Sequence, residues 1–261
     1  DGQNTRTASG KTTLWAAGKE FRAVRASGPQ LIAGEPYERT AALVDVSQQD
    51  SYVLDIFRVE GGKEHAKCFH GPLGQIAPQG LSLEPAQEAG YGAQMRGFQV
   101  DRRPSESWSV VWEIEAPPNY LPPGSEVHLK YADLTPGAEV LLAEGWVSTT
   151  LYGGTGEAWI PWLLVRRRAE NAPLASTFVS VVEPFGKEPA IESVRRLSLA
   201  DADGKARPEA DVALELRLAG GRRDVILALD PEGRDERRPD AGPVTQKETG
   251  VLLEGELCWV R

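Results

Sequence analysis

Histidine, cysteine and methionine are scarce in this chain, which has three histidines, two cysteines and one methionine among 261 residues. Two cysteines, Cys68 and Cys258, are too few for a disulfide framework or a cysteine-rich zinc site. We expect buried free thiols at both positions, with a single disulfide as the alternative. The shortage of reactive side chains restricts any chemistry to a few segments.

Other signals are missing as well. No run approaches the roughly 18 apolar residues that a membrane-spanning helix needs. The net charge of −9 argues against nucleic-acid binding, although a local basic cleft on an acidic protein can still attract a polyanionic sugar. We find no glycine-rich nucleotide loop between a strand and a helix, and no serine nucleophile elbow. We therefore expect neither a nucleic-acid partner nor a membrane partner.

Long helical periodicity is almost absent, and short apolar alternation bounded by Gly, Pro, Asp and Asn recurs instead. This pattern predicts an all-β protein, with a large antiparallel β-sandwich followed by a smaller β-sheet region. A break near residues 184–189 places the boundary: residues 1–186 form the sandwich and residues 187–261 the smaller region. The predicted strands are 12–16, 21–26, 40–46, 52–59, 65–70, 107–114, 126–132, 140–148, 159–167, 176–184, 191–199, 211–218, 224–229 and 250–261.

Residues 52–71 hold two of the three histidines, His65 and His70. The Glu-Gly-Gly-Lys at 60–63 predicts a hairpin between strands 52–59 and 64–70. A two-residue turn would place Asp55 opposite Cys68, whereas a three-residue loop with a bulge would place it on the same face as His65. The two histidines have opposite parity, so a regular strand points them to opposite faces.

Asp55 lies among apolar neighbours on its predicted face, and a carboxylate there is costly unless it is paired or binds a metal. Arg58, Arg39 or a cation is the expected partner. His65 and His70 also fit ordinary positions next to a turn and at a strand end. The tryptophans at 108, 112, 146, 159 and 162 fit either core packing or stacking on sugar rings.

Three parts of the sequence resemble the heparinase II/III-like polysaccharide lyases. The first is the run from Asp55 to Gly71, with Asp-Ile-Phe-Arg-Val, the Gly-Gly pair and both histidines. The second is Tyr-Glu-Arg-Thr at 37–40 with Leu-Val-Asp at 43–45, and the third is 176–184 with 191–197. The opening Asp-Gly-Gln-Asn is similar to the end of a family motif, so we expect the chain to be a piece of a longer protein.

The resemblance implies that the parent cleaves uronic-acid-containing polysaccharides, of glycosaminoglycan or alginate type, by β-elimination. In this family an N-terminal α/α toroid supplies most catalytic groups, so we expect no catalytic residue in this chain. The family also implies a structural zinc ion, for which Asp55 and His65 are the best matches, and a periplasmic or extracellular location. We assign His70 and Arg58 to binding of the acidic polysaccharide. The alternative is a non-catalytic carbohydrate-binding or structural β module.

Overall fold

The computed structural model describes residues 9–28, 36–71, 73–91, 94–115, 121–122, 124–148, 156–201, 204–231 and 244–261. This part of the chain consists of antiparallel strands and one short 3-10 helix, η1 (Ala89–Tyr91), so the predicted all-β class is confirmed. It contains no helix that is long and apolar enough to cross a membrane. The opening residues 1–4, which carry part of the family resemblance, lie outside the described residues.

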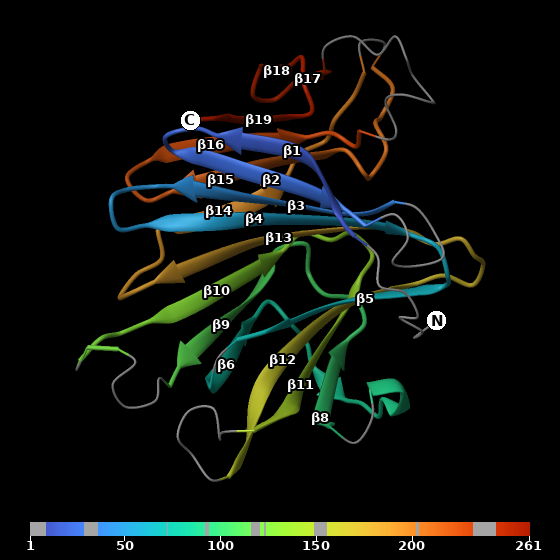
Figure 1. Cartoon of the computed structure of the whole chain (residues 1–261), viewed down its shortest axis with the longest axis vertical. Coiled ribbons are helices and arrows are strands. Elements are labelled where there is room, and N and C mark those ends of the chain that lie inside the picture. The colour runs from blue at the N-terminus through green and yellow to red at the C-terminus, as the bar shows by residue number, and fades with distance from the viewer. Residues whose placement is uncertain are drawn as a thin grey trace.

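An eight-stranded sheet forms the middle layer, with the order β1-β2-β3-β4-β13-β10-β9-β6 (Figure 1). We call it the central sheet. Its strands are β1 (Lys11–Ala17), β2 (Phe21–Ser27), β3 (Tyr37–Asp45), β4 (Ser51–Glu60), β13 (Ala175–Phe185), β10 (His128–Asp133), β9 (Trp108–Ile114) and β6 (Gly74–Gln79).

Two smaller sheets cover opposite faces of the central sheet. The five-stranded sheet has the order β5-β12-β11-β8-β7, with β5 (Glu64–His70), β12 (Glu157–Arg168), β11 (Glu139–Ser148), β8 (Met95–Asp101) and β7 (Glu84–Pro85). The C-terminal sheet has the order β14-β15-β16-β19, with β14 (Ile191–Arg196), β15 (Val212–Leu218), β16 (Arg222–Ala228) and β19 (Leu257–Val260). A two-stranded ribbon, β17 (Val244–Gln246) and β18 (Val251–Leu253), adjoins it.

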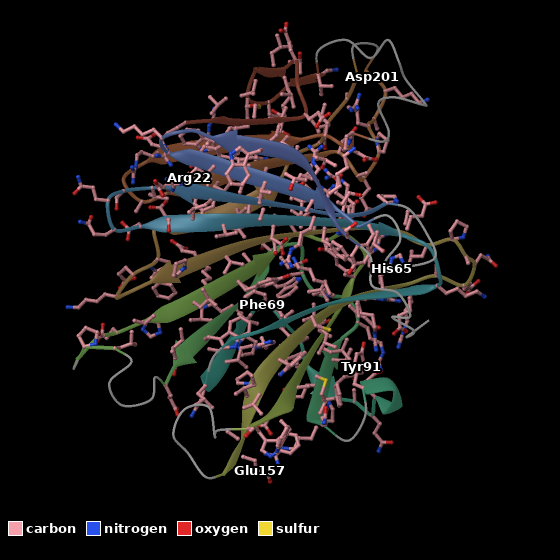
Figure 2. All side chains as sticks on the ribbon, in the orientation of Figure 1. Arg22, His65, Phe69, Tyr91, Glu157 and Asp201 are labelled. Atoms are coloured by element: carbon pink, nitrogen blue, oxygen red, sulfur yellow. The ribbon has the colours of Figure 1, made fainter. Side chains whose placement is uncertain are left out.

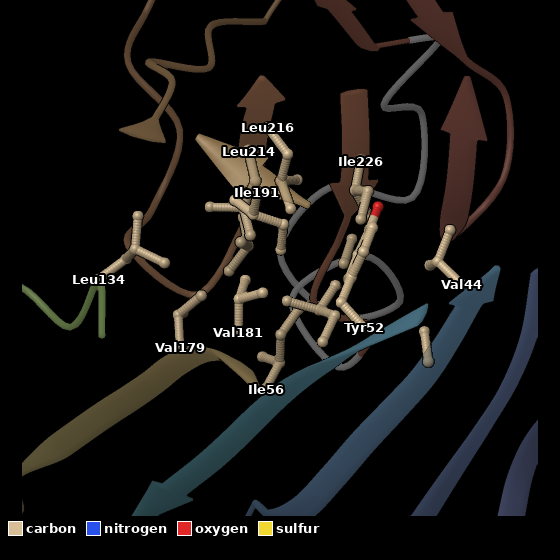
Figure 3. Packing of buried hydrophobic residues seen from close by; sticks show 14 of the residues in the cluster. Val44, Tyr52, Ile56, Leu134, Val179, Val181, Ile191, Leu214, Leu216 and Ile226 are labelled. Atoms are coloured by element: carbon tan, nitrogen blue, oxygen red, sulfur yellow. The ribbon is translucent and has the colours of Figure 1, made fainter. Parts of the chain in front are cut away.

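Alternation along β4 divides its side chains between two cores. Tyr52, Leu54 and Ile56 belong to the core shared with the C-terminal sheet. Figure 3 shows Tyr52 and Ile56 pointing toward Leu214 and Ile226. Phe57 and its neighbours point the other way, into the core shared with the five-stranded sheet. The C-terminal sheet therefore has no separate core on this side. It completes the core of the central sheet, although β13 ends and β14 begins near the predicted boundary at residue 186.

The predicted hairpin between residues 52–59 and 64–70 is wrong in both of its registers. β4 pairs with β3 and β13, whereas β5 leaves the central sheet and pairs with β12. Gly61 and Gly62 have φ values of 127° and 55°, which favour glycine. They let the chain change sheets between the two strands instead of folding back within one.

The sequence patterns missed four strands: β6, β8 and the two very short strands β7 and β17. Pro78 interrupts the pattern of β6, and it is tolerated because β6 is an edge strand. Gly97, with φ 67°, interrupts the alternation of β8 at an irregularity in its pairing with β11. Both cysteines are free, as expected, but neither is buried: Cys258 is partly exposed, and Cys68 is exposed because it alternates with the inward-facing Lys67 and Phe69 on β5.

Candidate functional site

Asp55 lies at the centre of a buried ion cluster between the central and five-stranded sheets. The guanidinium of Arg39 donates to both carboxylate oxygens, at 2.7 and 2.9 Å, and Nζ of Lys67 lies 2.7 Å from Oδ2. The side chains of Asp55 and Lys67 are 5% and 6% exposed, and that of Arg39 is 60% exposed. Burial alone would raise the pKa of the Asp55 carboxyl, but the two cations outweigh burial and hold its pKa below the usual value.

The cluster continues into β10 and β13 through hydroxyl groups. Lys67 Nζ donates to Ser180 Oγ at 2.8 Å and lies 5.6 Å from the centre of the Tyr131 ring. The Tyr131 hydroxyl donates to Asp133 at 2.6 Å. Burial raises the pKa values of both Asp133 and Tyr131. A network of this kind specifies how the two sheets dock, since each buried polar group needs its partner.

His65 lies near the start of β5, as Figure 2 shows. Its side chain is half buried. Its Nε2 lies 2.6 Å from the carbonyl oxygen of Gly61, and its Nδ1 lies 2.9 Å from Ser176 Oγ. A carbonyl only accepts, so Nε2 carries the proton and Nδ1 accepts from the serine hydroxyl. Burial lowers the pKa of His65, which favours this neutral form.

The structure does not bring Asp55 and His65 together. Asp55 is opposite Ser180 in the pairing of β4 with β13, whereas His65 contacts Ser176. These two serines are four residues apart on β13, or about 13 Å at roughly 3.3 Å per residue. Zinc ligands lie about 2 Å from the ion. The two side chains therefore do not fit one zinc ion in this arrangement, and the described residues contain no group of three or more metal-binding side chains.

The two residues assigned to substrate binding lie in very different environments. His70 is exposed at the end of β5, where its ring stacks on Trp162 with centroids 4.7 Å apart. Arg58 is only 2% exposed, and it donates to the carbonyl oxygens of Ala210 and Ala228 at 3.0 and 3.2 Å. Arg58 thus ties the C-terminal region to the central sheet. Substrate binding stays a prediction for both residues, and the contacts of Arg58 do not support it.

An exposed, partly apolar surface adjoins the ion cluster. The register places Trp15, Val24, Ala41 and Asp55 in one row across β1, β2, β3 and β4. The five-stranded sheet covers this face of the central sheet at Asp55 but not at β1, where Trp15 is 74% exposed. We call the surface formed by Trp15, Val24, Arg39, Ala41 and Leu43 the open face.

A cleft of about 880 Å³ lies between the end of the sandwich and the C-terminal region. Its walls come from the loop before β9, the loop after β10, β14 and residues 206–211. Five arginines line it, Arg102, Arg103, Arg195, Arg196 and Arg207, and so do four acidic residues, Glu106, Asp133, Glu209 and Asp211. The Nε atom of Arg195 lies 2.7 Å from a carboxylate oxygen of Glu215, and that of Arg207 lies 2.6 Å from a carboxylate oxygen of Asp211. Arg196 donates to backbone carbonyls. With nearly as many carboxylates as guanidinium groups in its lining, the cleft is only weakly basic.

Sequence reasoning missed Lys67, whose ammonium contacts the Asp55 carboxylate as closely as Arg39 does. A signal was present, because His65, Lys67 and Phe69 alternate on one strand and Phe69 belongs in a core. An inward lysine needs a buried anion, but only the pairing of β5 with β12 determines that this anion is Asp55.

No protein-family model and no curated protein matches the chain. Solved structures do. A structure of a heparinase III matches with a TM-score of 0.50 and 14% identity, covering 83% of this chain and 27% of that one. A heparan sulfate lyase HepC mutant from Pedobacter heparinus matches with a TM-score of 0.41 and 15% identity, covering 84% and 28% of the two chains. At this identity the first match shows the fold alone. The chain has a heparinase-like β fold and spans about a quarter of the length of the heparinase III that it matches.

Proposed function

We propose that this chain is the β-sandwich part of a polysaccharide lyase that cleaves uronic-acid-containing polysaccharides, of the glycosaminoglycan type, by β-elimination. The observation that carries the proposal is the match of 83% of the chain to a part of heparinase III. That protein's name refers to heparin, a glycosaminoglycan, and we extend the same substrate class to the parent of this chain. A periplasmic or extracellular location, where such polymers are met, belongs to the same proposal.

In this proposal the proton transfers are carried out by groups outside the chain. β-Elimination needs a base for the proton at C5 of the uronate, a cation or dipole for the resulting enolate, and an acid for the leaving oxygen. The buried Tyr131 and Asp133 are bonded to each other, and Asp55 is held by two cations. These groups stabilise the sandwich. The base, the cation and the acid of the reaction come from the rest of the parent protein, an α/α toroid.

The open face is the surface that we assign to this toroid. An exposed tryptophan beside other apolar side chains is typical of a protein interface. Arg39 brings a cation to its rim and is held in place by Asp55. If the toroid covers Trp15, replacing Trp15 with alanine should destabilise the parent by about 3–5 kcal/mol. The same change in the isolated chain should alter the free energy of unfolding by less than about 0.5 kcal/mol.

The activity is tested by incubating the isolated chain, and the parent with its upstream segment, with heparan sulfate. The ultraviolet absorbance of the unsaturated uronate product is followed over time. We expect product from the parent and none from the chain. Product from the isolated chain would place catalytic groups within it, and no product from the parent would reject a lyase for this substrate.

A further inference from the structure

The far end of the β11–β12 hairpin extends past the cover of the central sheet. On β11, Val140 and Leu142 are buried in the core between the two sheets. Glu144 and Trp146 continue on the same face by strand alternation, but both are exposed, and Trp146 is 40% exposed. The inner face of the five-stranded sheet therefore carries a large aromatic side chain beyond the point where the core ends.

Ion pairs and ring contacts fix the aromatic side chains at this end. Trp146 and Trp159 lie directly opposite each other in the pairing of β11 with β12. The Trp146 indole N–H donates to Glu157, which Figure 2 shows at the far end of the hairpin. The guanidinium carbon of Arg96 lies 3.9 Å from the centre of the Trp159 ring, and Arg96 Nε lies 2.8 Å from Glu144. We call these five residues the aromatic platform.

A bulge in β8 brings Arg96 to this face. Leu142 pairs with Gln99 and Glu144 pairs with Arg96, so β8 has one more residue than β11 across this interval. Gly97 lies in the interval with φ 67°, a conformation that favours glycine. Without the extra residue, alternation would turn Arg96 to the opposite face, away from Trp159. The bulge thus turns Arg96 toward the platform, and on the opposite face it lets Met95 pack against the cluster that contains Phe98 and Val100.

We propose that the aromatic platform binds a pyranose ring of an uncharged saccharide. The axial C–H groups of a pyranose form an apolar face that packs on an indole ring, and its hydroxyls need acceptors and donors at the rim. Glu144 and Glu157 supply carboxylate acceptors, and Arg96 supplies donors. The rim carries two carboxylates against one guanidinium. It therefore disfavours a sulfated or carboxylated ring, and the platform differs in charge preference from the acidic substrate of the proposed lyase.

The geometry suits binding because the platform side chains need little further ordering when a ligand binds. Each platform side chain is already held by a neighbour, so the rotamer entropy that a ligand must otherwise remove has been lost in folding. The proposal does not depend on lyase activity, because it concerns a surface separate from the ion cluster and the open face.

The test is isothermal titration of the intact chain with chitohexaose and cellohexaose as neutral probes and with a heparin hexasaccharide as the charged probe. We expect binding of at least one neutral probe, and about tenfold weaker binding after Trp146→Ala, the change that a loss of about 1.4 kcal/mol produces. Trp146→Tyr should retain most of the affinity. Trp15→Ala removes a tryptophan that is exposed on the open face, and it should leave the affinity unchanged.

Failure of both neutral probes to bind the wild-type chain overturns the proposal. Equal loss of affinity in Trp146→Ala and Trp15→Ala overturns it as well, because the effect would then not belong to the platform. Tighter binding of the heparin hexasaccharide that also depends on Trp146 would contradict the charge preference. If Trp146→Ala destabilises the parent protein but not the isolated chain, protein covers the platform and the saccharide assignment falls.

Discussion

Replacing Asp55 with asparagine tests whether the buried ion cluster holds the two sheets together. In the wild type, Lys67 Nζ lies 2.7 Å from Asp55 Oδ2, and both side chains are almost fully buried. Two unit charges at this distance attract by about 6 kcal/mol at an effective dielectric constant of about 20. Desolvation offsets much of that attraction, so the net value of the intact pair is far smaller.

The single substitution is more damaging than the net value of the pair suggests. Asp55→Asn keeps the shape of the side chain but leaves the Lys67 ammonium buried without a counter-charge. Removing one partner of a buried pair typically costs about 3–5 kcal/mol. We expect a loss of that size in the free energy of unfolding, measured by urea denaturation at pH 7. The double variant Asp55→Leu, Lys67→Met should recover most of the loss, because it removes both charges.

The pH dependence gives the sharper test. The folded-state pKa of Asp55 lies below its unfolded value, so its stabilising contribution is complete above the unfolded pKa, near 4. This contribution is lost as the pH falls through the folded pKa, where the wild-type carboxylate takes up a proton. The difference in the free energy of unfolding between wild type and Asp55→Asn should therefore shrink as the pH is lowered from 7 toward 3.

The matched control is Glu144→Gln, which breaks the exposed pair with Arg96 at a similar distance of 2.8 Å. An exposed pair contributes about 0–1 kcal/mol, so this variant should stay close to wild type at both pH values. A loss below about 1 kcal/mol for Asp55→Asn at pH 7, or a loss that does not shrink on acidification, would refute the assignment of a stabilising buried ion pair.

Three further predictions test other parts of the structure. A Cβ at Gly71 would overlap the ring of the buried Trp112, so Gly71→Ala should cost about 1–3 kcal/mol, and equal melting temperatures would contradict this. Arg58→Met should lower the urea midpoint of the isolated chain by removing the tie to the C-terminal region. Weaker polysaccharide binding by the parent at unchanged stability would instead support a substrate role. Elemental analysis should show the same zinc content in the wild type, Asp55→Asn and His65→Gln, because Asp55 and His65 do not share an ion. Zinc that is present in the wild type and lost in each variant would restore the predicted site.

The sequence alone determined the class of fold and the positions of most strands. Alternation of apolar and polar residues is a local property, so the strand near 52–59 and its two faces could be read without the structure. The same pattern showed that Asp55 needed a partner, and Arg39 was among the candidates. The strands β6 and β8 were missed because a proline and a bulge glycine interrupt their alternation.

Only the tertiary structure decided which strands pair and which residues meet. Residues 60–63 carry a hairpin signal, but the two glycines also permit a change of sheet, and local sequence does not distinguish these outcomes. The choice depends on β12, whose pairing with β5 joins segments about a hundred residues apart in the chain. That pairing places β5 in the sheet that packs against β4. As a result the ammonium of Lys67, and not the imidazole of His65, contacts Asp55. The need for a counter-charge was local and therefore readable, whereas its identity depended on long-range packing.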